Sequence, residues 1–417
     1  MTFRTFIMSI ALCFGITSTA IALDVTAIKA GHIIMPETGE VLDNKIILIN
    51  GRTITDIVDT MPKEGITNVI DLSDQWVLPG LMDMHTHLSA IINDDGNIGG
   101  DSGLNKSNAT RALMGAQMAK EMLYGGFTTV REVGNSADYV DTALREAIER
   151  HRIEGPRIIN SGKIISVFGG QTHGISFENS GFWEREYIDV VSPDDMRRAI
   201  HKNIYFGARM IKLVVGDHPY SLSDETLKAA VDEAKSAGMT IAIHAWGDQQ
   251  VARATRAGAT SIEHGPFASE ETLKLMKDKG VFLVGTEFPA RYLEIFWGNK
   301  NAAENMAASS IEQMKKAYKV GVPMAFGTDI IMRYENETRD VMALNYLDMW
   351  TAANIPPAYI IKAMTINGAK VLGMEAQLGS IEKGKIADII AVPSNPLDDI
   401  YALQKVSFVM QSGRKIR

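Results

Sequence analysis

The sequence of 417 residues contains a single cysteine, Cys13, and that residue lies in an apolar stretch near the N-terminus. If this stretch is removed, no thiol remains, so disulfides and cysteine chemistry are excluded. The chain also has no heptad run, low-complexity tract or short-period repeat, which argues against a coiled coil or a repeat array. Its stability must therefore come from packing and from bound metal.

An excess of positive charge is also missing. The chain has 42 Lys and Arg against 50 Asp and Glu, a formal net charge of -8. Nucleic acids and anionic membrane surfaces would repel such a protein at long range. We therefore expect a small-molecule or dipeptide substrate, no nucleic acid, and no membrane association after N-terminal cleavage. Self-association into a homo-oligomer is compatible with this composition.

The N-terminal stretch "MTFRTFIMSIALCFGITSTAIALD" carries one Arg, then an apolar run too short to span a bilayer, then Ala20-Ile21-Ala22. This pattern is typical of a secretory signal peptide, residues 1–22, with cleavage after Ala22. We therefore expect a periplasmic or secreted protein. A lipid anchor is the alternative, but Leu12 precedes Cys13 where a lipoprotein signal needs a small residue.

The rest of the chain shows two kinds of sequence pattern. Residues 23–79 and 375–417 contain short Val-, Ile- and Thr-rich runs broken by Gly, Asn and Asp, which predicts a small composite β-sandwich built from both chain ends. Residues 80–374 alternate apolar strands with amphipathic helices, which predicts an α/β fold, a (β/α)8 TIM-like barrel. The candidate strands are 82–87, 127–132, 157–162, 210–215, 239–244, 260–264, 281–286 and 323–328. The Gly-rich stretch 167–190 is expected to be a long loop over the site.

Polar residues collect where these strands end. In such a barrel the C-terminal strand ends face one shared mouth. His85 and His87 lie two residues apart and therefore share one face of a strand, so both can bind one metal ion. Imidazole and carboxylate are good ligands for zinc or a similar divalent ion. The candidate metal-site residues are His85, His87, Lys212, His244, His264 and Asp329.

Lys212 lies in the apolar run "MIKLVV", where an ammonium would be buried at large cost unless it is paired or chemically altered. Burial lowers the pKa of a lysine, and an uncharged amine beside metal can react with carbon dioxide. The resulting carbamate has two oxygens able to bridge two ions. The alternative is that Lys212 forms an ordinary ion pair.

Several further residues lie near the expected mouth. They are His173 in "GGQTHG", His218 and Tyr220 in "GDHPYS", and Arg333 and Tyr334 after the last strand. A substrate carboxylate requires a cation nearby, which Arg333 or His173 can supply. His173, Tyr220, Arg333 and Tyr334 are therefore candidate substrate-binding residues, with a purely structural loop role as the alternative.

Taken together, the motifs resemble the amidohydrolase superfamily, and within it imidazolonepropionase-like enzymes and Xaa-Pro dipeptidase- or carboxypeptidase-type metallopeptidases. The matching stretches are "PGLMDMHTHL", "GGFTTVREVG", "IKLVV", "IAIHAWGDQQVARATRAGATSIEHG", "MAFGTD" and "TINGAKVLGMEAQLGSIEKGKIADIIAVPSNPLDDI".

This resemblance implies two divalent metal ions, zinc or alternatively manganese or cobalt. His85, His87 and Asp329 would hold one ion, His244 and His264 the other, and a carboxylated Lys212 would bridge both. A metal-bridging hydroxide would be the nucleophile, because bound zinc lowers the pKa of water to about 7. Asp329 would be the catalytic residue that moves the proton to the leaving amine.

The chain departs from the family pattern in two places. Many relatives have a "PHG"-like stretch after the last strand, where this chain has "IIMRYENETRD". Glu132 stands where an Asp is usual. Because of both differences, the resemblance does not define the substrate.

The sequence thus predicts a binuclear metal-dependent amidohydrolase that cleaves a peptide or N-acyl amino acid amide bond, like an Xaa-Pro dipeptidase or carboxypeptidase. A mononuclear deaminase or a cyclic-amide or lactone hydrolase is the first alternative, and it would have no use for a carbamate. The second alternative is a non-catalytic binding protein that inherited the barrel. Such a protein could lose metal ligands freely, whereas all six are present here.

Overall fold

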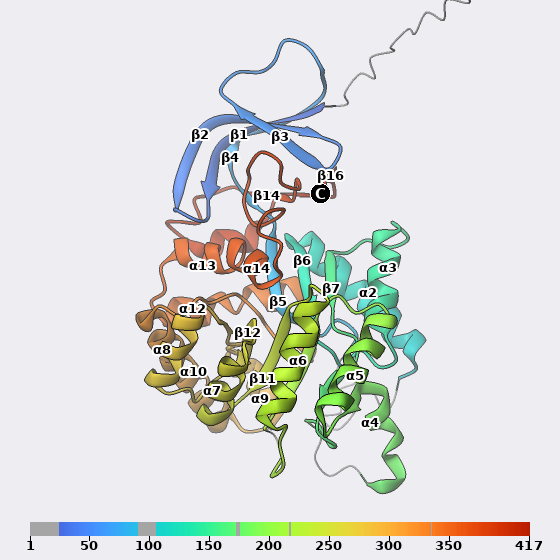
Figure 1. The fold of residues 1–417 in the computed structure, drawn as a ribbon. Helices are drawn as coiled ribbons and strands as arrows, with labels where there is room; N and C mark the ends of the chain where they lie inside the picture. The colour runs from blue at the N-terminus through green and yellow to red at the C-terminus, as the bar shows by residue number, and fades with distance from the viewer. Residues whose placement is uncertain (1–24, 91–105, 172–175, 217, 335) are drawn as a thin grey trace, which may run out of the picture.

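The computed structural model describes residues 25–90, 106–171, 176–216, 218–334 and 336–417. The predicted signal segment with Cys13 and Ala22, and the candidate His173, lie outside the described residues. In Figure 1 a sheet domain at the top sits on a larger body of parallel strands and helices. In the described part of the chain, no helix has the length and apolar character to cross a membrane.

The two chain ends form one seven-stranded sheet. Its order is β16-β15-β14-β4-β1-β2-β3, and β1 and β4 pair in parallel while the other neighbours are antiparallel. The strands are β1 (Val25–Met35), β2 (Glu40–Asn50), β3 (Thr53–Val58), β4 (Ile66–Pro79), β14 (Ile389–Val392), β15 (Phe408–Gln411) and β16 (Arg414–Lys415).

This sheet encloses its own apolar core, to which Ile28, Ile47 and Phe408 belong. A bridge between Thr53 and Ile386 brings the β3 edge back to the segment before β14. The sequence predicted a β-sandwich from both chain ends, and the structure shows that both ends contribute strands to one seven-stranded sheet. The reason is that β4 is 14 residues long and pairs with both β1 and β14.

The larger body contains two parallel sheets. One has the order β5-β6-β7, with β5 (Leu81–Thr86), β6 (Phe127–Glu132) and β7 (Arg157–Asn160). The other has the order β13-β12-β11-β10-β8-β9. Its strands are β8 (Ile164–Ser166), β9 (Tyr187–Asp189), β10 (Ile211–Val215), β11 (Ile241–Ala245), β12 (Ser261–His264) and β13 (Phe282–Val284).

Backbone hydrogen bonds connect these two sheets at two places. On one side, the segment 323–329 lies between β13 and β5, since Ala325 N donates to Leu283 O (3.0 Å) and Met84 N to Phe326 O (2.8 Å). On the other side, Arg209 N donates to Asn160 O (2.7 Å) at the end of β7. The predicted third strand, 157–162, corresponds to β7, and the further strand β8 was not predicted; the predicted last strand is reduced to a bridge between Leu283 and Met324.

Helices pack around the parallel strands (Figure 1). Ser192 begins α5 with a capping box to Asp195, and the Ser223 hydroxyl accepts from Thr226 N at the start of α6. The helices are α2 (Asn108–Tyr124), α3 (Val140–Glu149), α4 (Gly181–Glu186), α5 (Pro193–Tyr205), α6 (Asp224–Ser236), α7 (Asp248–Ala257), α8 (Glu270–Lys279), α9 (Ala290–Trp297), α10 (Lys300–Val320), α11 (Arg339–Leu344), α12 (Leu347–Ala352), α13 (Pro357–Ala363) and α14 (Ile366–Val371), with 3₁₀ turns η1 (Phe177–Asn179) and η2 (Ile400–Lys405).

The expectation of a structureless loop over 167–190 is wrong for its second half, which contains η1, α4 and β9. Strand β9 pairs in parallel with β8. Trp183 and Tyr187 stack with ring centroids 4.2 Å apart and bury a small core with Ile164 and Val214. Burial of these two aromatic rings stabilises the segment, which composition alone did not reveal.

A partly buried ion pair joins the two halves of the molecule. Arg157 of β7 lies with its Nη1 2.6 Å from Asp388 Oδ2, just before β14. The other oxygen of Asp388 accepts from Ser412 N at 2.7 Å. Arg157 also donates to Thr129 Oγ1 (2.8 Å). The pair thus ties the parallel strands to the C-terminal sheet.

Replacing Asp388 by Ala should leave the Arg157 guanidinium without its carboxylate and lower the free energy of unfolding by about 2 kcal/mol, because a charge that stays mostly buried loses its partner. Urea denaturation followed by circular dichroism measures the change in midpoint. The matched control is Asp56→Ala, which removes an exposed carboxylate from its pair with Lys383 and should leave the midpoint unchanged. Equal midpoints for both variants would contradict this role of Asp388.

Candidate metal centre

The strand register places Lys212 and His244 on the same inner face. In the parallel pair of β10 and β11, Lys212 is paired with Ala242, and Val214 with His244. Paired residues of neighbouring strands point to the same side, and so do residues two apart on one strand. Lys212 therefore lies on the same face of the sheet as the His244 imidazole, and its paired residue Ala242 comes two residues before His244.

Backbone conformation brings His264 and Asp329 into the same space. His244 is paired with Glu263, so regular alternation would send Glu263 inward and His264 outward. His264 instead has φ +70° and Asp329 has φ +56°, a left-handed conformation that side chains with a Cβ rarely adopt. Such residues cost about 1–3 kcal/mol each and persist where the surroundings hold them.

His85, His87 and Asp329 form the tightest cluster of ligand atoms. One ligand atom from each residue lies within 4.8 Å of the other two. Asp329 Oδ1 is 3.0 Å from His87 Nε2 and 3.5 Å from His85 Nε2. Both histidines are buried. Two imidazoles and a carboxylate are a donor set that suits zinc or a related divalent ion, so this cluster can bind a metal.

His244 and His264 lie beside this cluster. Their ring centroids are 4.5 Å apart, and the His264 ring is 5.1 Å from that of His85. Lys212 is 2% exposed, and all six residues line one cavity of about 420 Å³. The structure therefore brings all six predicted site residues together from five different segments of the chain.

Burial, together with the nearby positive charge of Lys212, holds the pKa of His85 well below its ordinary value. Burial, His244 and Lys212 do the same to the pKa of His264. These imidazoles are therefore neutral at neutral pH, which is the form that binds metal. Burial opposes charge on His87 as well, but its hydrogen bond to Asp329 raises the pKa of His87.

Partners behind the ligands fix which ring nitrogen faces the cavity. His85 Nδ1 donates to Glu263 Oε2 (2.7 Å), and His87 Nδ1 donates to Gly134 O (2.8 Å). His264 Nδ1 lies 2.7 Å from the Thr286 hydroxyl. The Nε2 atoms of His85 and His87 thus face Asp329. Outer partners of this kind orient metal ligands and raise their basicity.

Glu263 belongs to a buried ionic network that sequence reasoning missed. Its Oε1 accepts from Arg131 Nη2 at 2.7 Å and from Ser261 Oγ at 2.5 Å. Arg131, Ser261 and Glu263 are all fully buried. Alternation along β12 contained the signal, because Ser261 and Glu263 lie two residues apart and therefore share one face of the strand.

Two more buried carboxyl groups hold the turns that carry the ligands. Glu132 accepts from Leu88 N and from Thr86 Oγ1, both at 2.8 Å, so it secures both sides of His87. Asp83 accepts from His85 N (3.0 Å) and from the Thr328 hydroxyl (2.7 Å), which joins β5 to the turn before Asp329. Burial raises the pKa of each carboxyl group to about 7.

The described substrate candidates lie away from the cavity lining. The Tyr220 hydroxyl donates to Phe168 O (3.0 Å), and the Tyr220 ring stacks on His218. Arg333 lines a separate cavity of about 220 Å³. Tyr334 packs edge-on against Tyr292. The substrate-binding roles of Tyr220, Arg333 and Tyr334 stay predictions. The lining instead includes Arg111, Gln171, Glu186 and Trp246, which the sequence did not single out.

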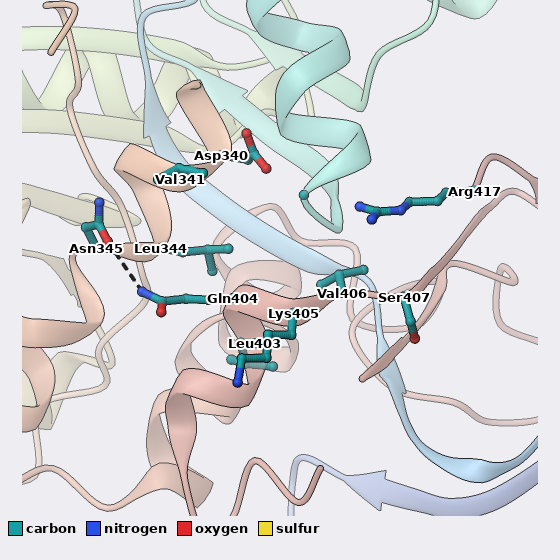
Figure 2. Close-up of a pocket in the computed structure, with 11 residues that line it drawn as sticks. Asp340, Val341, Leu344, Asn345, Leu403, Gln404, Lys405, Val406, Ser407 and Arg417 are labelled. Atoms are coloured by element: carbon teal, nitrogen blue, oxygen red, sulfur yellow. Dashed lines mark hydrogen bonds between the residues drawn. The ribbon is translucent and has the colours of Figure 1, made fainter. Parts of the chain in front are cut away.

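A larger cavity of about 530 Å³ lies elsewhere, between α11, η2 and the C-terminal Arg417. Figure 2 shows its lining, where Gln404 donates to Asn345 (3.3 Å). This cavity contains none of the six predicted site residues and no histidine. Chemistry, and not size, therefore makes the 420 Å³ cavity the candidate functional site.

Comparison with known proteins agrees with this geometry. The model of the Amidohydrolase family matches residues 76–416. An ochratoxinase from Aspergillus niger is 28% identical over 94% of this chain and 86% of its own. A 5-methylthioadenosine/S-adenosylhomocysteine deaminase from Thermoanaerobacter pseudethanolicus is 28% identical over 86% of this chain and 82% of its own. A solved Xaa-Pro dipeptidase with bound methionine in the active site is 30% identical with a TM-score of 0.84, covering 94% of this chain and all of its own.

The chain belongs to the Amidohydrolase family. With relatives of these kinds, it is a hydrolase of the type that acts on carbon–nitrogen bonds. Members of this family are typically metal-dependent, in agreement with the cluster of His85, His87 and Asp329.

Replacing Glu263 by Gln should weaken metal binding by about 10- to 100-fold, because His85 loses the carboxylate that accepts its Nδ1 proton. Titration of the metal-loaded protein with a competing chelator measures this affinity. Glu271→Gln, at an exposed position of α8, is the matched control and should bind metal like the wild type. Unchanged affinity in the Glu263 variant would show that the network has no influence on the ligand.

Proposed function

We propose that the protein is a binuclear metal-dependent amidohydrolase that cleaves the amide bond of a dipeptide or an N-acyl amino acid, leaving a free carboxylate on the amine product. The observation that carries this proposal is the convergence of Lys212 with four imidazoles and Asp329 around one cavity. We also infer that the two parallel sheets and the segment 323–329 together close the (β/α)8 barrel that presents these residues.

The six residues divide into two ligand sets. His85, His87 and Asp329 would hold one ion, His244 and His264 the other, and Lys212 as a carbamate would contribute to both. Lys212 is buried and lines the same cavity as the four imidazoles and Asp329, which is the position that a carbamate between two ions would need. Bound divalent ions would polarise the scissile carbonyl and lower the pKa of water to about 7. Zinc suits this donor set, with manganese and cobalt as alternatives.

Asp329 is placed to handle the proton. Its backbone N donates to His85 O at 2.7 Å, and its φ of +56° turns the side chain toward the imidazoles. A carboxylate held there can accept a proton from the attacking water and deliver it to the leaving amine nitrogen. Without this transfer, the departing amine would leave as an unstable anion.

A second candidate is a mononuclear deaminase or cyclic-amide hydrolase. The compact cluster of His85, His87 and Asp329 supports it, as does the deaminase relative. In that reaction Lys212 would have no metal-bridging role. The two candidates therefore differ in what a change at Lys212 does.

Lys212→Ala should reduce the bound metal from two ions per chain to one or fewer, and should lower amide hydrolysis by more than about 100-fold, since loss of a ligand exceeds the effect of losing an outer partner. Elemental analysis and initial rates measure both. The control is Lys163→Ala, another buried lysine, which pairs with Asp138 outside this cavity. Partial recovery of activity with added short-chain carboxylates would support a carbamate. Unchanged metal and turnover would favour the mononuclear candidate.

A hydrolysis screen tests the proposed reaction directly. It covers Xaa-Pro and other dipeptides, N-acyl amino acids and lactones, with zinc, manganese or cobalt supplied. We expect amide substrates with a free carboxylate to be cleaved and a chelator to abolish the activity. Ammonia release from aminopurines without any peptide cleavage would overturn the proposal in favour of a deaminase.

We further propose that residues 1–22 direct export and that cleavage follows Ala22, which would place the enzyme in the periplasm or outside the cell. N-terminal sequencing of the protein recovered from the producing cells tests this. A mature chain that begins at Met1 would contradict it.

A further inference from the structure

The metal-centre cavity has two unlike walls. The residues that follow β5 and β6, with α2 and α4, contribute Ala90, Arg111, Asn135 and Glu186. The residues that follow β11 and β13, with α9 and α10, contribute an apolar wall. Since β5 and β6 belong to one parallel sheet and β11 and β13 to the other, the two walls come from different sectors of the strand order. The apolar wall consists of Trp246, Phe288, Leu293, Trp297, Met306 and Ile331.

The polar wall is built around a buried ion pair. Arg111 Nη1 pairs with Glu186 Oε1, and both side chains are almost fully buried. Arg111 Nε donates to Ser89 O (2.9 Å), and Glu186 Oε2 accepts from Ala137 N (2.9 Å). An apolar group placed against this pair would gain little, because the charges must keep their polar partners. Arg111 Nη2 also donates to Asn135 O, so this wall stays polar, and the polar half of a substrate is better placed here than an apolar half.

The apolar wall begins directly at the metal ligands. The Trp246 ring centroid is 6.3 Å from that of His244 and 6.1 Å from that of His264. Trp246 is 38% exposed and Trp297 is 39% exposed, although both line the cavity. Indole surface that faces water inside a cavity is stabilised when an apolar group covers it. Trp246 also contacts the exposed ring of Phe267, which extends the apolar surface outward.

We infer that the enzyme selects substrates with a large apolar acyl group, above all an aromatic one, and that Trp246 and Trp297 are the specificity residues that contact it. This inference rests on the proposed function, which places the carboxylate on the amine half of the substrate. That half lies along the Arg111–Glu186 wall, so the acyl half lies against the two indoles. The scissile amide then sits between the walls, beside the metal ligands.

The first test is a binding measurement that requires no turnover. Phenylacetate and acetate share a carboxylate and differ by an aromatic ring. Isothermal titration of the metal-loaded protein should show phenylacetate binding at least about tenfold more tightly than acetate. This ratio should fall toward one in Trp297→Ala and Trp246→Ala. Tyr205→Ala removes an exposed aromatic residue outside the cavity and should keep the ratio. Metal content is measured for every variant.

The second test locates the aromatic ring on the substrate. We expect the wild type to cleave N-phenylacetylalanine with a kcat/KM at least about tenfold above that for N-acetylalanine. N-acetylphenylalanine carries the ring on the amine half and should show no such gain. In the Trp297→Ala variant the ratio of kcat/KM for N-phenylacetylalanine to that for N-acetylalanine should fall toward one, whereas Tyr205→Ala should keep the wild-type ratio.

The outcomes separate this inference from the proposed reaction. Equal binding of phenylacetate and acetate by the wild type, or a full ring preference in both tryptophan variants, would overturn the inference. An equal gain with N-acetylphenylalanine would overturn the assignment of the wall to the acyl half. A strong ring preference in binding, with no amide cleaved, would support the apolar wall and refute the proposed reaction.

Discussion

Burial of Lys212 beside four histidines is the constraint on which the rest of the site depends. Lys212 is 2% exposed and lines the same cavity as the four imidazoles and Asp329. Close packing of these basic groups is unfavourable when all of them are charged, so neutral imidazoles lower the free energy of the arrangement. The lowered pKa values of His85 and His264 have the same causes, because burial and the nearby Lys212 both disfavour a charged imidazole at these positions.

The scaffold satisfies this constraint with a layer of buried polar groups beneath the ligands. Glu263 and Arg131 neutralise each other while Glu263 orients His85, and Asp83 and Glu132 hold the turns on either side of the histidine pair. Buried groups of this kind are costly when unpaired and rigid when fully paired. These paired buried groups thus hold the side chains of the cavity in position.

The cavity combines this polar centre with surfaces of opposite character. An ion pair lines one side and partly exposed indoles line the other, so a substrate with one charged and one apolar half would satisfy both. Family membership agrees with a hydrolytic centre, but it does not explain why one wall of the cavity is polar and the other apolar. The residues of both walls come from loops and helices that follow the strands. Such segments vary without disturbing the scaffold.

The sequence by itself indicated the six residues that the structure brings to one cavity, because His85 and His87 two apart, Lys212 in an apolar strand and Asp329 after the last predicted strand are local patterns that an ordinary buried core rarely contains. It also indicated most strand positions, since apolar runs between capped helices are local features. It could not show Glu263, whose role depends on a register between β11 and β12, or the turn of His264 by a positive φ. Nor could it show the single seven-stranded sheet, the further strand β8, or the walls of the cavity. These depend on contacts between segments far apart in the chain, and only the folded structure brings such segments together.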